Sequence, residues 1–225
     1  MLLTIDDILT PDQVATVRQQ LAQAQWEDGG STAGQLAAQV KRNQQVAEHC
    51  PSLSGLRALV VQALQQHGVF MSAALPCRMA PPQFNRHAGE ANHYGWHVDS
   101  GVRMHNGGMV RADVSATLFL SAPDSYEGGE LRIQDTFGTH AVKGAAGSLV
   151  LYPSSSVHEV SPVTRGERLG CFMFIQSLVR SPEQRRLLHD MDMALLQLRQ
   201  AHGDSAPVVQ LTGTYHNLLR QWAET

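Results

Sequence analysis

The chain has 225 residues, of which 43% are hydrophobic and 16% charged, with a formal net charge of −3 at pH 7. These values are typical of one globular domain with or without helical additions, and the weak negative charge argues against a nucleic-acid partner. The three cysteines, Cys50, Cys77 and Cys171, are widely separated and odd in number, so a disulfide framework or structural zinc site is not expected and a reducing, cytoplasmic location is favoured.

Residues 1–77 are expected to form a helical and loop segment that supports the rest of the chain. Thr10, Pro11 and Gln13 have the cap, first-turn proline and N3 pattern of a helix start. After a Gly-rich stretch, apolar residues recur at helical spacing from Leu53 to Leu64. No apolar run approaches the roughly 20 residues that span a bilayer, and the chain start lacks a secretory pattern, so no membrane partner is expected.

Residues 78–178 have the pattern of a β core. In the stretch DVSATLFLS, Val114, Ala116 and Leu118 alternate on one face. The stretches GELRIQ, THAVK, SLVLYP and RLGCFMFIQSLV follow, separated by Gly, Pro and Ser turns. Many short strands with this punctuation predict a sandwich or barrel rather than a parallel α/β sheet.

Residues 179–225 are predicted to be helical. Ser181 and Pro182 repeat the cap and proline signature, and apolar residues recur at helical spacing from Leu187 to Leu198. A last helix is expected around residues 215–222. We expect these helices to pack on the β core, so that the whole chain is one compact unit. They could also form the interface of a homo-oligomer.

His97 and Asp99 suggest a metal site. Residues i and i+2 of an extended strand point to the same face, so the stretch WHVDS would present an imidazole and a carboxylate together. His158, which follows the stretch SLVLYPSSS, is the candidate for a third ligand. Such a facial triad leaves open positions on the metal. The His-x-Asp pattern alone is equally explained by a polar loop.

Arg168 strengthens the case for a binding site. If strands flank the stretch PVTRGE, the turn between them brings Arg168 deep into the barrel, near the metal. A guanidinium is suited to a bidentate grip on a carboxylate. A metal with open positions and a carboxylate clamp behind it indicates a site for a chelating 2-oxo diacid.

The stretches FNRHAGEANHYGWHVD, GGEL and GSLVLYPSSSVHEVSPVTRGER resemble the iron(II)/2-oxoglutarate dioxygenases of the prolyl 4-hydroxylase superfamily. The chain is similar over nearly its whole length, including YHNLLRQWAE near its end, to the bacterial PKHD-type hydroxylases. The resemblance implies a mainly β protein with flanking helices, whose core is a double-stranded β-helix of the jelly-roll or cupin-like kind.

The same resemblance implies the ligands and the reaction. Fe(2+) would be held by His97, Asp99 and His158, and 2-oxoglutarate by Arg168. With O2, and with L-ascorbate as a supporting reductant, the enzyme would hydroxylate a small-molecule or peptidyl substrate. That reaction is coupled to oxidative decarboxylation of 2-oxoglutarate to succinate and CO2. The resemblance also suggests a link to iron homeostasis.

The chain departs from the family pattern at one position. Relatives carry a tyrosine ten residues before the first metal histidine, where this chain has His87. Its imidazole could donate a hydrogen bond to the cosubstrate and make binding sensitive to pH. Tyr94 is the other candidate for this contact. Arg103 and Arg111 flank a Gly-containing loop and could contact an acidic substrate, although a solvated loop is the ordinary interpretation.

Two other functions stay open from the residues alone. One is a non-catalytic jelly-roll module that binds or senses a ligand; the complete set of candidate residues argues against it. The other is a zinc-dependent hydrolase on a cupin-like barrel. A hydrolase would give Arg168 no role, and no general base is evident beside His97 and Asp99.

Overall fold

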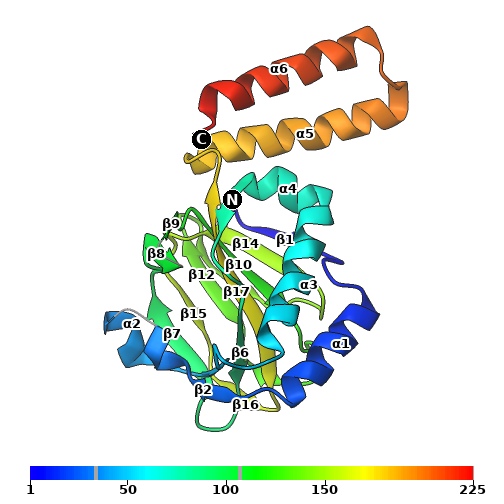
Figure 1. The fold of residues 1–225 in the computed structure, drawn as a ribbon. Coiled ribbons are helices and arrows are strands. Elements are labelled where there is room, and N and C mark those ends of the chain that lie inside the picture. The colour runs from blue at the N-terminus through cyan, green and yellow to red at the C-terminus, as the bar shows by residue number, and fades with distance from the viewer. Residues whose placement is uncertain (33–34, 106–107, 225) are drawn as a thin grey trace.

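Two antiparallel sheets form the centre of the molecule in the computed structural model, which describes residues 1–32, 35–105 and 108–224 (Figure 1). In the described residues the larger sheet has eight strands. They are β1 (Leu3–Ile5), β14 (Leu149–Pro153), β10 (Val114–Phe119), β17 (Arg168–Ser177), β6 (Gln83–His87), β4 (Gln44–Val46) and β2 (Trp26–Asp28) in spatial order, with β5 (Pro76–Met79) also paired to β17.

The smaller sheet has five strands in the described part of the chain. They are β13 (Gly138–Val142), β12 (Leu131–Asp135), β15 (His158–Val160), β7 (His93–His97) and β3 (Lys41–Arg42) in spatial order. Two further pairs of short strands lie in the described residues: β8 (Val102–His105) pairs with β9 (Gly108–Arg111), and β11 (Glu127–Gly128) pairs with β16 (Val163–Arg165). The predicted mainly antiparallel β architecture is confirmed.

Strand alternation divides the larger sheet into two faces. Leu169, Cys171 and Ile175 of β17 join the apolar core under the helices α1 (Pro11–Ala22), α3 (Leu53–Gln66) and α4 (Gly68–Ala74). The alternate residues Arg168 and Phe172 line a cavity of about 240 Å³ between the two sheets. The strand therefore presents one set of alternate residues to the helices and another set, which includes Arg168, to the cavity.

The N-terminal segment contributes more than helices and loops. The predicted helix start is present: Thr10 and Gln13 form a capping box at the start of α1. However, β1, β2 and β4 extend the larger sheet and β3 extends the smaller one. The expectation of a helical and loop segment over residues 1–77 is thus incomplete. Strands of two or three residues are too short to show alternation in a sequence. The short helices η1 (Gly29–Thr32) and α2 (Gln35–Val40) lie between β2 and β3.

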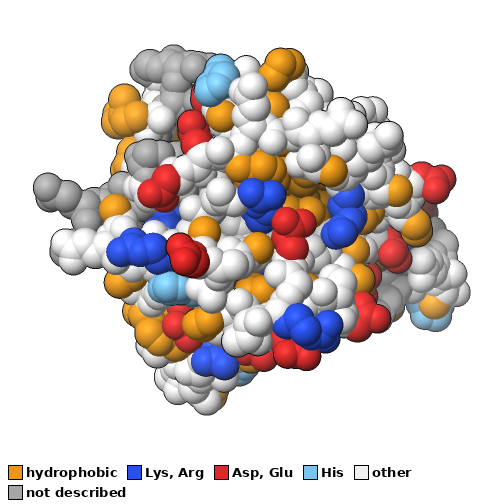
Figure 2. Space-filling model, turned by 90° about the horizontal axis from the view of Figure 1, so that it is seen from below, with side chains coloured by type: hydrophobic (Ala, Val, Ile, Leu, Met, Phe, Trp, Pro, Cys, Tyr) orange, Lys and Arg blue, Asp and Glu red, His pale blue; other side chains and the backbone are white. Residues whose placement is uncertain are grey.

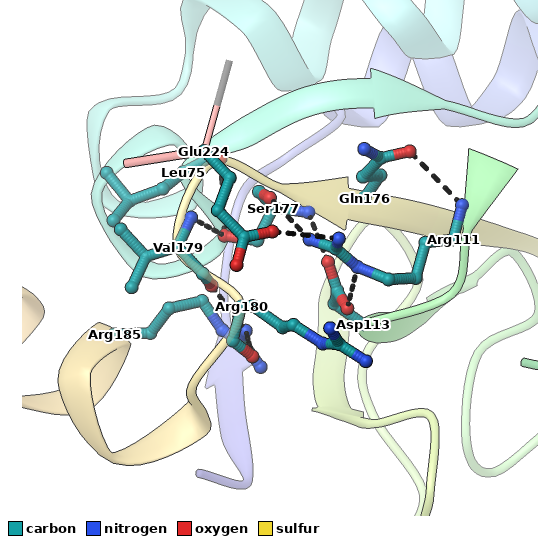
Figure 3. A network of polar contacts seen from close by, with 9 residues as sticks. All are labelled: Leu75, Arg111, Asp113, Gln176, Ser177, Val179, Arg180, Arg185 and Glu224. Carbon is teal, nitrogen blue, oxygen red and sulfur yellow. Dashed lines mark hydrogen bonds and ion pairs between the residues drawn. The ribbon is translucent and has the colours of Figure 1, made fainter. Parts of the chain in front are cut away.

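The C-terminal helices α5 (Pro182–His202) and α6 (Ala206–Trp222) form a hairpin that projects from the core in Figure 1. Its base packs on α4 and on residues that follow β17, through Leu75 and Val179. A polar network then ties the chain end to the core (Figure 3): Arg111 of β9 pairs with Asp113 at 2.8 Å and with Glu224 at 2.9 Å. Among the described residues, no helix combines the length and apolar character that crossing a membrane requires.

Charged side chains of both signs are interspersed on the end of the molecule that carries β16, which Figure 2 views directly. An ion pair between β11 and β16 joins Arg165 to Glu127 at 2.9 Å. Among the described side chains that Figure 2 colours, no extended patch of a single sign is seen on this face.

Candidate metal centre

Three candidate ligands converge on one side of the cavity. β15 pairs with β7 so that His158 lies directly opposite His97, and Asp99 follows two residues after β7 ends. One oxygen of Asp99 is 4.0 Å from His97 Nε2 and the other is 3.7 Å from His158 Nε2. One ligand atom from each residue lies within 4.8 Å of the other two. The structure thus brings together the three residues predicted to bind a metal.

Hydrogen bonds aim these side chains. His97 Nδ1 donates to the Gly95 carbonyl at 2.8 Å, and His158 Nδ1 donates to the Ser156 carbonyl at 3.0 Å. Because a carbonyl only accepts, both Nδ1 atoms carry a proton, which leaves Nε2 of each ring as the atom that can bind a metal. Burial, followed by the nearby His158, lowers the pKa of His97 to about 4. His97 is therefore neutral at pH 7, the form that binds a metal.

Asp99 is held by a hydroxyl from the facing sheet. Ser115 Oγ, on β10, donates to Asp99 Oδ2 at 2.7 Å and lies 2.8 Å from Ser154 Oγ. Two oriented imidazoles and one oriented carboxylate are a donor set that fits a divalent transition metal with open positions.

Arg168 is a buried cation in the same cavity. It is the first residue of β17, its side chain lines the cavity, and it is only 1% exposed. Its Nε, Nη1 and Nη2 atoms have no hydrogen-bond partner among the described residues. Burial lowers the pKa of Arg168, and the nearby Tyr126 and Tyr152 oppose that shift. An unsatisfied buried guanidinium is costly, so this arrangement points to an anionic ligand.

His87 and Tyr94 occupy different positions, and of the two only Tyr94 is among the described residues that line the cavity. His87 is fully buried opposite Arg168 in the β6–β17 register, and its Nδ1 has no partner in the described chain. Burial, then Arg168, lowers its pKa well below the usual value, so His87 stays neutral and does not supply the expected pH sensitivity. Tyr94 lines the cavity and stacks on His97, with ring centroids 3.6 Å apart.

Several cavity residues were missed in the sequence. Tyr152, Thr117 and Asn85 all line the cavity. The Tyr152 ring lies 4.9 Å from that of His158, and burial raises its pKa well above the usual value. Thr117 could have been predicted from the sequence. Ser115 and Thr117 alternate with Val114 and Ala116, so the strand has one polar and one apolar face.

Comparisons with known proteins place the chain in a family. The profile of the 2OG-Fe(II) oxygenase superfamily matches residues 82–176, and that of the PKHD-type hydroxylase C-terminal domain matches residues 183–224. A PKHD-type hydroxylase from Nitrosomonas europaea is 62% identical over 227 residues, covering 100% of both chains.

Solved structures share the fold at low sequence identity. A Pseudomonas putida prolyl-4-hydroxylase superposes with a TM-score of 0.52 and 23% identity, over 78% of this chain and 92% of that one. HygX from Streptomyces hygroscopicus, solved with nickel, 2-oxoglutarate and hygromycin B, gives a TM-score of 0.54 and 16% identity, over 79% of this chain and 84% of that one. Together with the full-length relative, these matches show that the chain belongs to the PKHD-type hydroxylases, which are 2-oxoglutarate-dependent enzymes with the 2OG-Fe(II) oxygenase fold.

Proposed function

We propose that His97, Asp99 and His158 hold Fe(2+), and that Arg168 holds the distal carboxylate of 2-oxoglutarate. The observation that carries this proposal is the unpaired, buried guanidinium of Arg168 in the cavity that also contains the three converging ligands. An anionic ligand would satisfy the hydrogen-bond donors of such a guanidinium. 2-Oxoglutarate has one end that chelates a metal and another that is a carboxylate.

The protein's own part in the reaction is to bind and orient. Iron(II) with 2-oxoglutarate and O2 would supply the oxidising power to hydroxylate an unactivated C–H bond, yielding succinate and CO2. The Gly95 and Ser156 carbonyls hold the two imidazoles, and Ser115 holds the carboxylate. The apolar cluster around Phe119 and Val160 packs between the sheets and shields the site from water. These supports favour one fixed arrangement of the ligands.

His87 is proposed as a second contact for the cosubstrate carboxylate. It lies beside Arg168 in the sheet, and its unpaired Nδ1 can donate once Nε2 accepts from Asn43, 3.2 Å away. Tyr94 packs on His97, and we propose that it supports the ring of that ligand rather than the cosubstrate.

A zinc hydrolase fits the cavity less well. Hydrolysis at a metal needs a general base beside the metal-bound water. Among the described residues that line the cavity, Asp99 is the one carboxylate, and it belongs to the triad. The buried Arg168 would have no partner in such an enzyme.

The remaining parts of the proposal concern the biological setting. The substrate is a small molecule or a peptidyl residue, ascorbate maintains the iron in its reduced state, and the reaction is linked to iron homeostasis; these follow from the family resemblance. Homo-oligomerisation through the C-terminal hairpin is supported by exposed apolar side chains at Leu187, Leu196 and Val209.

Succinate formation tests the function. The protein is supplied with Fe(2+), ascorbate, O2 and ¹³C-labelled 2-oxoglutarate, and labelled succinate is followed by NMR over hours, because turnover without a substrate is slow. We expect succinate from the wild-type protein and none from Asp99→Ala. A non-catalytic module would give none from either protein, and a zinc hydrolase would bind zinc without consuming 2-oxoglutarate. Either result would contradict the proposal.

A further inference from the structure

Besides Arg168, the cavity lining contains two other cations, Lys41 and Arg103, that the proposed iron and cosubstrate sites do not use. Lys41 comes from β3 and is 4% exposed, and its Nζ lies 5.3 Å from the centroid of the Tyr94 ring and 5.7 Å from that of Phe172. Arg103 comes from β8, and its Cζ lies 4.1 Å from the centroid of the Phe174 ring.

The two rings under these cations form one platform. Phe172 and Phe174 are alternate residues of β17 and meet edge to face, with ring centroids 5.8 Å apart. One cation therefore lies over each ring, on the wall of the cavity. The aromatic faces offset part of the cost of holding two like charges near each other.

Arg103 is incompletely satisfied at the open end of the cavity. Its guanidinium pairs with Asp99 at 3.8 Å, and its Nε is buried with no hydrogen-bond partner in the described chain. Its side chain is 26% exposed, and its neighbour Met104, which also lines the cavity, is 70% exposed. A metal on Asp99 would take up the charge that now faces Arg103.

The charges of the cavity do not balance once iron and cosubstrate are counted. Lys41, Arg103 and Arg168 supply three positive charges and Asp99 one negative charge among the described lining residues. Because iron adds two positive charges and 2-oxoglutarate two negative ones, the lining keeps a surplus of two positive charges. Asp28, outside the cavity lining, offsets part of the charge of Lys41. A surplus of positive charge in a cavity lined by protein favours a third, anionic occupant.

The size of the cavity places that occupant at the open end. Pockets that enclose a drug-sized ligand measure roughly 300–1,000 Å³. This cavity measures about 240 Å³ and must also hold 2-oxoglutarate. Only the reacting part of a substrate can therefore enter the cavity. The rest of the substrate must lie at the open end, beside Arg103 and Met104.

We propose that Lys41 and Arg103 form a second anion site, and that the substrate hydroxylated by this enzyme carries a carboxylate that binds there. Nε and Nη2 lie on one edge of the Arg103 guanidinium and match the two oxygens of a carboxylate. Lys41 adds a point charge beside them. The inference rests on the proposed function, because it assigns the other carboxylate clamp, Arg168, to the cosubstrate.

The experiment uses the full-length protein with Mn(2+) in place of iron and saturating 2-oxoglutarate, so that no turnover occurs. Mn(2+) and 2-oxoglutarate binding are measured first for each protein. The probes are benzoate, its uncharged counterpart benzamide, and phenyl phosphate, and the readout is enhanced relaxation of their protons by the bound Mn(2+). The variants are Lys41→Met and Arg103→Met, with Arg186→Met on the exposed side of α5 as the charge-matched control.

We expect benzoate, but not benzamide, to be relaxed by the wild-type protein. The benzoate dissociation constant should rise about 10-fold or more in each cavity variant and stay unchanged in Arg186→Met, because a hydrogen bond to a charged group is lost in the first two. Unrelaxed benzoate, competition with 2-oxoglutarate, equal relaxation of benzamide, tighter binding of phenyl phosphate, or unchanged affinity in both cavity variants would each overturn the inference. Failure of the wild-type protein to bind Mn(2+) and 2-oxoglutarate would instead overturn the proposed function, and the inference with it.

Discussion

Replacing Arg168 with methionine should change cosubstrate affinity and protein stability in opposite directions. In the absence of ligand, the Arg168 guanidinium is buried without a hydrogen-bond partner in the described chain. Its removal should raise the free energy of unfolding of the ligand-free protein by about 1–2 kcal/mol, because a buried unpaired charge costs more than an apolar side chain of similar length. If Arg168 served only the fold, its replacement would lower the free energy of unfolding and leave cosubstrate affinity unchanged.

Cosubstrate binding should weaken strongly in the same variant. Two charge-assisted hydrogen bonds to a carboxylate, each contributing about 1.5–3 kcal/mol, correspond to a loss of about 3–6 kcal/mol. The dissociation constant of 2-oxoglutarate should therefore rise about 10²–10⁴-fold. Calorimetric titration of the Mn(2+)-loaded protein measures this constant, while the affinity for Mn(2+) itself should be unchanged.

Arg185 provides the matched control. It is 4% exposed, but its Nη1 donates to the carbonyls of Val179 and Arg180 at 2.7 and 2.8 Å (Figure 3). Arg185→Met should lower the free energy of unfolding by about 2 kcal/mol, since two carbonyls lose a charged donor, and should leave 2-oxoglutarate affinity unchanged. If Arg168→Met behaved like Arg185→Met in both measurements, the assignment of Arg168 as a carboxylate clamp would be refuted.

Three further outcomes are expected. Ser115→Ala removes the 2.7 Å hydrogen bond to Asp99 and should weaken metal binding about 10–100-fold in a competition assay. Lys41→Met should stabilise the metal-free protein by about 3 kcal/mol at pH 7, because burial, followed by Arg103, lowers the pKa of Lys41 from 10.5 to about 8 despite the opposing Asp28 and Asp99. Since the folded pKa lies below the unfolded value, this gain is complete below pH 8 and disappears as the pH rises toward 10.5, which denaturant unfolding of both proteins measures. Asp113→Ala should cost about 3 kcal/mol, because Asp113 accepts from Arg111 and from the Ser177 amide, whereas Glu224→Gln should cost less than about 1 kcal/mol at its exposed position (Figure 3).

Each of these outcomes can fail. Unchanged metal affinity in Ser115→Ala would mean that Asp99 can bind the metal without the hydrogen bond from Ser115. A stability difference between wild type and Lys41→Met that does not vary with pH would show that Lys41 is not held as a costly buried charge. Equal losses of unfolding free energy in Asp113→Ala and Glu224→Gln would show that Glu224 holds the C-terminal hairpin to the core as strongly as Asp113 does.

Part of this site could be predicted because its residues keep their spacing in the sequence. His97 and Asp99 are separated by one residue in the sequence, and their side chains point toward the same place in the structure. The stretch SLVLYP was visible as a strand from its apolar pattern, and the turn after it leads to His158, which lies opposite His97. Arg168 was expected inside the barrel because of the turn before it, where Gly166 adopts a φ of 79°.

Other parts depend on contacts between distant segments and could not be predicted. Lys41 reaches the cavity only because β3 pairs with β7, which puts it beside Tyr94. A two-residue strand is too short to show the alternation that would predict such a pairing. The lowered pKa of His87 likewise comes from its complete burial opposite Arg168. The sequence suggested instead that its imidazole would titrate near neutral pH.

The central claim is that one metal and one 2-oxoglutarate share the cavity, and an anaerobic titration tests it most directly. Metal-free protein is titrated with Fe(2+) and then with 2-oxoglutarate, and the weak visible charge-transfer band of the iron chelate is followed. We predict that the band appears with one equivalent of each in the wild-type protein, and that it is absent from Asp99→Ala, which should not retain iron. Iron binding without a band, or an undiminished band in Asp99→Ala, would contradict the account.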